Sequence, residues 1–306
     1  MQPRYPALTR RDLLRNAAMA MSALVFPAPL AWWRMGDPDH ERLTDWTAVL
    51  RTEGLSRSDV PVGRAAARVG ELAIGTRYQP FTLEAYLRAG GSPRHEPLIL
   101  SLTRFDCTTL VEACLAVARV AAGEGAVSWD RFGQEIERMR YRGGKRRGYG
   151  SRLHYFSEWI TDGDVRGLLK DRGAELGGIE DARPLRFMTA HRGSYPALAD
   201  DAVFREIGTM ERRLDGHPRR MVPAEHVHEV SDQIDTGDVL AFATEIPGLD
   251  VSHAAFAYRD GGGVLRVLHA PLSGGVVQVS RGSLPQYVAA IRRCTGILVA
   301  RPLPDL

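Results

Sequence analysis

Cys107 is the residue of this 306-residue chain best placed to act as a nucleophile. It follows Asp106 and opens the segment 107–118, in which apolar residues recur at the spacing of one buried helix face. Backbone N–H groups at a helix start favour a thiolate, lower the thiol pKa and can stabilise an oxyanion. We therefore expect acyl-transfer chemistry at Cys107, whereas Cys114 and Cys294 are typical of small buried hydrophobic residues.

Two histidines in the last third of the chain could supply the base that a cysteine nucleophile needs. His253 interrupts the apolar run 251–257, and His269 ends the run 264–269, so both imidazoles are expected in β-strands. A turn at 260–263 would make these strands adjacent and antiparallel and would bring the two rings together. Either histidine alone is also typical of a buried core residue, but the pair can provide a base and the group that holds its tautomer.

The elements around these residues place helices first and an antiparallel sheet later. Asp106 is a favourable N-cap for the helix that begins at Cys107. Helical spacing predicts helices over 63–75, 107–118, 130–141 and 197–214. Short β-rich runs between turn residues predict strands over 98–102, 239–244, 252–258, 264–269 and 276–279. This order is typical of an α+β fold.

Several motifs resemble those of the NlpC/P60 cysteine peptidases. The segment 106–111 is similar to their Asp-Cys-Ser-Gly-Leu-Val, and three others are similar to Gly-Thr-Pro-Tyr, Pro-Gly-Asp-Leu and Ser/Trp-His-Val-Gly, namely 75–78, 236–240 and 252–255. The segments 151–157 and 187–196 resemble one branch, the DUF1460 family of N-acetylmuramoyl-L-alanine amidase-like proteins. The sequence departs from the general pattern at Thr108-Thr109 and at Arg77.

The resemblance implies a papain-like α+β fold, in which the helix carrying the cysteine packs on an antiparallel sheet and a helical insertion occupies about 123–232. It implies Cys107 as the nucleophile. It also implies His253 as the base that takes the thiol proton and later protonates the leaving amine, with His269 orienting that base.

Other residues match positions that line the substrate cleft in these enzymes: Tyr78, Asp106 and Ser252. Asp106 could equally serve only as the helix cap. The insertion could cover a sheet edge, or it could form a wall over the cleft that recognises glycan or stem peptide. For the second role we expect arginines for carboxylates and aromatic faces for sugars, from Arg152, His154, Tyr155, His191, Arg192 and Tyr195.

The resemblance therefore implies a cysteine amidohydrolase of peptidoglycan fragments (muropeptides) that cleaves the bond between N-acetylmuramic acid and L-Ala. Cleavage between D-Glu and the diamino acid, and a non-catalytic cell-wall binding module, are the alternatives. No cofactor or metal is expected, because the chain has neither H-E-x-x-H nor C-x-x-C. The pair His226-Val-His228 and the set of Cys107, His253 and His269 are nevertheless possible zinc ligands.

The first 31 residues have the order of an export signal. The paired arginines Arg10-Arg11 precede an apolar run at 17–26 and a stretch of small residues and prolines at 27–31. The pair resembles a twin-arginine signal, and the apolar run is too short to span a bilayer. We expect a single catalytic domain at 32–306, periplasmic or secreted, without stable membrane insertion.

The charge of the chain argues against nucleic-acid binding. The net charge is +3, but the first 31 residues hold four arginines against one acidic residue, so the remainder has no net charge. Nucleic-acid binding needs clustered positive charge to displace counterions. A nucleic-acid partner is therefore not expected.

Overall fold

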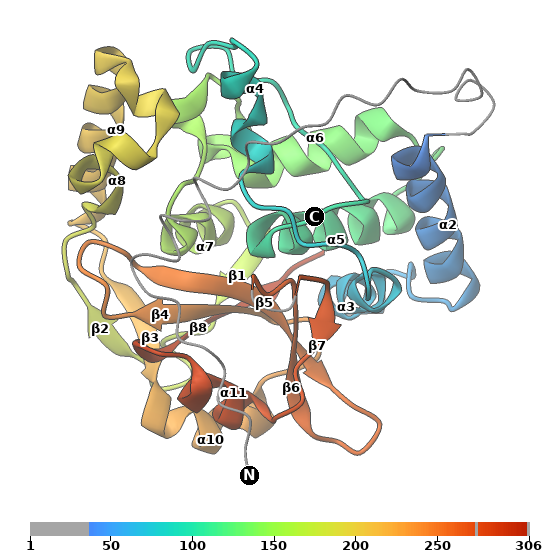
Figure 1. Ribbon diagram of the computed structural model, residues 1–306. Helices are drawn as coiled ribbons and strands as arrows, with labels where there is room; N and C mark the ends of the chain where they lie inside the picture. Colours follow the sequence, from blue (N-terminus) through green and yellow to red (C-terminus); the bar gives the residue numbers. More distant parts are fainter. Residues whose placement is uncertain (1–36, 273–274, 305–306) are drawn as a thin grey trace. The chain divides into compact units, whose positions relative to one another are not determined.

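An antiparallel sheet forms the middle layer of the structure (Figure 1). The computed structural model describes residues 37–272 and 275–304, and in this part the strand order is β2-β3-β8-β4-β5-β6-β7, with β1 also paired to β8. The strands are β1 Leu169–Asp171, β2 Ile179–Asp181, β3 Arg219–Pro223, β4 Val239–Thr244, β5 Val251–Arg259, β6 Leu265–His269, β7 Gln278–Val279 and β8 Cys294–Pro302. Every pair is antiparallel, as predicted for the C-terminal third.

Helices cover both faces of the sheet, with α2, α3, α5 and α6 on one side and α10 and α11 on the other (Figure 1). Their bounds are α2 Pro38–Thr52, α3 Val62–Leu72, α4 Ala85–Arg88, α5 Cys107–Ala122, α6 Trp129–Arg140, α7 Phe156–Val165, α8 Phe187–Ala190, α9 Asp201–Leu214, α10 Val227–Val230 and α11 Leu284–Ala290. Within the described residues, no helix combines the length and the apolar character that a membrane span requires. The predicted export signal at 1–31 lies outside the described residues.

Side chains of the central strands alternate between two cores, as the pleat of a strand requires. On β4, Val239 and Ala241 face the core that includes α3 and α5, whereas Leu240 and Phe242 face the core beneath α10 and α11. All of β4 is buried because both faces are covered. Removal of this apolar surface from water, at about 25 cal/mol per Å², holds the layers together.

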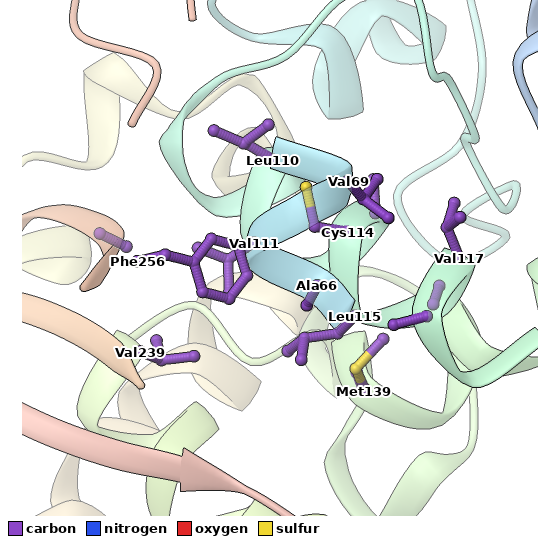
Figure 2. Packing of buried hydrophobic residues seen from close by; sticks show 14 of the residues in the cluster. Ala66, Val69, Leu110, Val111, Cys114, Leu115, Val117, Met139, Val239 and Phe256 are labelled. Carbon is purple, nitrogen blue, oxygen red and sulfur yellow. The ribbon is translucent and has the colours of Figure 1, made fainter. Parts of the chain in front are cut away.

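The helix α5 is buried along its length and carries Cys107 at its first position. All residues from 109 to 121 are buried, and Figure 2 shows Cys114 near Val69 of α3 and Leu115 near Met139 of α6. The predicted helix start is confirmed, and Cys114 is a buried core residue, as expected. All three cysteines are free thiols. Close packing on every side fixes the position of the first turn of α5.

The hairpin of β5 and β6 is confirmed. Phe256 lies opposite Leu268, and the turn closes with the Asp260 N–H donating to the Val264 carbonyl at 3.0 Å. Gly263 has a φ of 81°, which glycine adopts without steric cost. The hairpin therefore places the start of β5, which carries His253, near the end of β6, which carries His269.

The strand predicted at 98–102 is wrong, because this segment has no strand partner in the described structure. Side chains satisfy its backbone groups instead. Arg140 donates to the Ile99 carbonyl at 2.6 Å, Arg42 donates to the Leu102 carbonyl at 2.7 Å, and the Leu102 N–H donates to Asp39 at 2.6 Å. The apolar run packs under α6 and α2 without joining the sheet.

The segment predicted as a helical insertion, 123–232, contains strands as well as helices. The strands β1 and β3 both pair with β8, and β2 pairs with β3, so the segment extends the main sheet. Its helices α8 and α9 enclose a separate apolar core around Tyr149, Leu198 and Ile207. The segment is therefore partly continuous with the sheet and not a purely helical cover.

A contact between two glycines sets β4 against α3. Gly237 has a φ of 93°, and a Cβ at this position would lie 2.0 Å from the backbone of Gly63. The next residue, Asp238, is buried and accepts two hydrogen bonds from Arg301, at 2.7 and 2.8 Å. The motif at 236–240 thus fixes the start of the strand that supports β5.

Candidate active site

Asp106 and Thr109 form a capping box that sets the first turn of α5. The Asp106 carboxylate accepts from the Thr109 N–H at 2.8 Å, and the Thr109 hydroxyl accepts from the Asp106 N–H at 2.9 Å. Asp106 therefore acts as the helix cap, one of the two roles that the sequence left open. Burial raises the pKa of its carboxyl group.

The Cys107 thiol reaches β5 at Ala254, the residue that follows His253. The sulfur interacts with the backbone N–H of Ala254, the residue after His253, and with the N–H and hydroxyl of Thr108. Cys107 is partly buried, so a substrate can approach it from one side. The fold thus brings the cysteine on α5 to the strand that carries His253, which is 146 positions away in the sequence.

The two histidines are in direct contact, as the hairpin geometry predicts. His253 Nε2 lies 2.8 Å from His269 Nδ1, and the rings meet edge to face with centroids 5.1 Å apart. His269 is only 2% exposed, whereas His253 is partly exposed. Because Nε2 of His253 is engaged by His269, Nδ1 is the nitrogen that remains for another partner.

Burial decides the protonation states at the site. Burial, aided by the charge of Asp106, raises the pKa of the Cys107 thiol to about 11. The expected lowering of this pKa is therefore wrong, since desolvation of the sulfur outweighs the N–H groups of the helix start. Burial also lowers the pKa of His253 to about 4. Near neutral pH the thiol and the imidazole are both uncharged.

Tyr78 lies on a short bridged segment, near enough to Cys107 for the two groups to interact electrostatically. Tyr78 forms a parallel β-bridge with Phe105, and the Gln79 N–H donates to the Phe105 carbonyl at 2.8 Å. Burial and the nearby charges of Cys107 and Asp106 raise the pKa of the Tyr78 phenol. The hydroxyl therefore keeps its proton near neutral pH.

Ser252 is exposed and lies next to His253, where its hydroxyl contacts the Phe242 carbonyl at 3.4 Å. His154 and Tyr155 are held within the insertion. His154 Nε2 lies 2.8 Å from the Tyr149 carbonyl, and burial lowers the pKa of this histidine. The Tyr155 hydroxyl is buried and donates to Glu211 at 2.6 Å.

His191 and Arg192 also make their contacts within the insertion. His191 Nδ1 lies 2.8 Å from the Phe187 carbonyl, and its ring packs on Phe187. Arg192 forms an ion pair with Asp201 and lies over the ring of Phe204 at 4.3 Å. The structure thus joins Tyr78, Asp106 and Ser252 to the surroundings of Cys107 and His253, while the insertion residues have partners of their own.

Arg152 is buried in a charge cluster. It pairs with Glu84, lies 3.6 Å from Glu96, and stacks over the ring of Tyr149 at 4.8 Å. Its side chain is 5% exposed and that of Glu96 is 1% exposed. The charge that sequence reasoning assigned to substrate carboxylates is therefore already paired with carboxylates of the protein.

Replacement of Arg152 by methionine is expected to lower the free energy of unfolding by about 3–5 kcal/mol, because Glu96 and Glu84 would lose their counter-charge. Urea unfolding measures this change. Arg192→Met is the matched control, since its pair with Asp201 is exposed and should contribute less than about 1 kcal/mol. Unchanged unfolding with a raised KM would instead assign Arg152 to substrate binding.

The described residues offer no candidate metal site. In 37–272 and 275–304, no group of three or more His, Cys, Asp and Glu side chains is arranged to hold a metal ion. The His226 ring contacts Glu229 at 3.1 Å, and His228 contacts the Glu225 carbonyl at 2.8 Å. These two histidines are therefore engaged locally.

Tyr287 is a member of the site that sequence reasoning missed. Its hydroxyl lies 3.0 Å from His269 Nδ1. The only local signal was the helix start at 283–286, where Ser283 and Gln286 form a capping box. That pattern predicts a helix but gives no indication that its tyrosine reaches a histidine on another element.

Solved structures similar to this chain include amidases. A crystal structure of an N-acetylmuramoyl-L-alanine amidase from Bacteroides uniformis is 30% identical, covers 79% of this chain and 99% of its own, and has a TM-score of 0.72. A Bacteroides fragilis structure named provisionally as a xylanase is 31% identical, covers 76% and 99%, and has a TM-score of 0.66. A Legionella pneumophila protein labelled DUF1460 shares the fold at 18% identity, covering 86% and 95%, with a TM-score of 0.61.

The family comparison covers most of the chain. No curated protein matches it. The family model described as AmiA-like, N-acetylmuramoyl-L-alanine amidase-like, matches residues 68–297, which include Cys107, His253 and His269. The chain therefore belongs to the AmiA-like family of N-acetylmuramoyl-L-alanine amidase-like proteins.

Proposed function

We propose that this protein is a cysteine amidohydrolase of the NlpC/P60 type that cleaves the N-acetylmuramoyl-L-alanine bond of peptidoglycan fragments. The observation that carries the proposal is the interaction of the Cys107 thiol with the Ala254 N–H of β5, one residue after His253, which in turn contacts His269 at 2.8 Å. The family match and the amidase from B. uniformis support an amide of this kind as the substrate. The papain-like arrangement of a cysteine helix on an antiparallel sheet is part of this proposal.

The reaction starts from a neutral thiol and a neutral imidazole. His253 Nδ1 accepts the Cys107 proton as the sulfur attacks the amide carbonyl, so the thiolate exists only while the new S–C bond forms. His253 then donates this proton to the leaving amine, and the amine departs as the C–N bond breaks. Water, deprotonated by the same imidazole, attacks the thioester, and the carboxylic acid leaves with the thiol restored.

The first turn of α5 and Tyr78 are positioned to bind the oxyanion. Because the capping box uses the Thr109 N–H, the N–H of Cys107 remains as the helix-start donor closest to the reacting carbonyl. Tyr78, whose hydroxyl is neutral and which interacts electrostatically with Cys107, supplies a second donor. Exposed Ser252 lies at the edge of this site and contacts the substrate.

An amide is favoured over a glycosidic bond at this site. A glycosidase uses two carboxyl groups that flank the bond, whereas Asp106, the carboxyl adjacent to Cys107, is engaged in the helix cap. The xylanase name of the B. fragilis structure therefore gains no support from this arrangement. We also propose that residues 1–31 direct export, so that the enzyme meets its substrate in the periplasm or outside the cell.

Cleavage of a disaccharide tetrapeptide, followed by mass spectrometry, tests the proposed function. We expect free disaccharide and intact tetrapeptide from the wild-type protein and neither from Cys107→Ala. Disaccharide dipeptide would move the cut to the bond after D-Glu and keep the nucleophile. Binding to peptidoglycan without cleavage would identify a binding module, and release of reducing sugar from xylan alone would identify a glycosidase.

A further inference from the structure

The two histidines form a closed cycle of four aromatic rings with Phe242 and Tyr287. Phe242 stacks on His253 with centroids 5.8 Å apart, and His253 meets His269 at 5.1 Å. Tyr287 of α11 closes the cycle, with its ring 5.0 Å from His269 and 5.2 Å from Phe242. The cycle holds the planes of both imidazoles, and its tyrosine is the one ring that also places a hydroxyl against a histidine nitrogen.

Two groups lie within hydrogen-bond distance of His269 Nδ1. It lies 2.8 Å from His253 Nε2 and 3.0 Å from the Tyr287 hydroxyl. A neutral imidazole carries its proton on one nitrogen and a lone pair on the other. Nδ1 can therefore either accept from these neighbours or donate to one of them, and the choice sets the tautomer of both histidines.

The surroundings of Nε2, the second nitrogen of His269, favour the tautomer with the proton on Nδ1, which would make His253 unable to accept the thiol proton. Nε2 of His269 is buried and has no hydrogen-bond partner in the described structure. A proton on Nε2 would leave a buried donor unpaired, so the histidine pair on its own favours the proton on Nδ1. His269 would then donate to His253 Nε2, and the proton of His253 would occupy Nδ1, the nitrogen that must accept the thiol proton.

We propose that Tyr287 is a positioning residue whose hydroxyl donates to His269 Nδ1 and thereby selects the tautomer in which His253 Nδ1 carries a lone pair. This inference rests on the proposed function, in which His253 is the base. An O–H aimed at Nδ1 stabilises the lone pair there and keeps the His269 proton on Nε2. The His253 Nε2–H then shares the single lone pair of His269 Nδ1 with the Tyr287 O–H, and its share is largest when His253 becomes an imidazolium.

Tyr287→Phe removes the hydroxyl and keeps the ring, so the aromatic cycle remains. We expect kcat to fall about 10-fold to 100-fold with KM changed less than about twofold, because the fraction of His253 in the active tautomer decreases. Tyr258→Phe is the matched control. Tyr258 lies on β5, and its hydroxyl bonds to Glu71, so its loss should leave kcat unchanged.

Nitrogen NMR of the full chain labelled with ¹⁵N-histidine separates this role from a structural one. In the wild-type protein we expect the proton of His253 on Nε2, and in Tyr287→Phe a shift of population to Nδ1. Signals are assigned with His253→Ala and His269→Ala. A wild-type His253 that carries its proton on Nδ1, or a lower kcat in Tyr287→Phe with unchanged tautomers, would overturn the proposal.

The outcomes also separate this inference from the proposed function. Full activity of Tyr287→Phe alongside an inactive Cys107→Ala would refute the role of Tyr287 and leave the cysteine mechanism intact. Full activity of Cys107→Ala would refute the mechanism itself, and with it the inference. The NMR readout does not depend on turnover, so it tests the tautomer selection in either case.

Discussion

Cys107→Ala will lower kcat for amide cleavage by about 10⁴-fold or more, because the variant has no atom that can form the acyl-enzyme. Burial raises the pKa of the thiol to about 11, so the sulfur reacts as a thiol whose proton leaves during attack. Initial rates with disaccharide tetrapeptide measure the loss. Substrate affinity should remain close to that of the wild type, since alanine removes only the sulfur.

The other two cysteines provide controls for this result. Cys294 lies on β8, where its sulfur contacts the Gly296 carbonyl at 3.3 Å, and Cys294→Ala should retain kcat within about twofold. Cys114→Ala should lower stability through loss of core packing but leave kcat unchanged in the folded protein. Retention of substantial amide cleavage by Cys107→Ala, or its loss in Cys294→Ala, would contradict the assignment of the nucleophile.

The parts of the site that the sequence predicts are those set by local rules. Helical spacing and an Asp N-cap identify the start of α5 at Cys107. The turn at 260–263 sets the register of β5 and β6, so the contact between His253 and His269 follows from the length of a hairpin. These features depend on residues that are close together along the chain.

The parts that the sequence does not predict depend on partners from distant segments. The apolar run 98–102 resembles a strand, but its carbonyls are taken by side chains of Arg42 and Arg140. The Arg152 guanidinium could bind a substrate carboxylate, but it is already paired with the carboxylates of Glu84 and Glu96. No local pattern reveals how deeply a charge is buried, and burial decides its role.

The thiol pKa shows the same limit. A helix start lowers the pKa of a cysteine when the sulfur remains solvated, which is the basis of the expectation for Cys107. In the folded protein the sulfur is buried against β5, so the desolvation penalty dominates. Tyr287 was missed for a related reason, because only the fold brings α11 against His269.

His253→Ala will reduce kcat/KM by about 10²-fold to 10⁴-fold, the usual contribution of a general base.

The burial of His253 also determines how the activity of the wild-type enzyme depends on pH. Burial lowers the pKa of His253 to about 4, so the imidazole is neutral and able to accept a proton throughout the mildly acidic range. kcat/KM should rise as pH increases through about 4 and should then stay constant through neutral pH.

The sign of this dependence follows from the protonation of the base. Below pH 4, His253 is an imidazolium and has no lone pair for the Cys107 proton, so activity is lost. Near neutral pH the thiol also keeps its proton, because its pKa is about 11, and the neutral pair persists. An acid limb centred near the ordinary histidine value of about 6.5 would mean that the imidazole is solvated in the active enzyme. Circular dichroism at each pH separates loss of the base from unfolding, and a profile that His253→Ala leaves unchanged would assign the base to another residue.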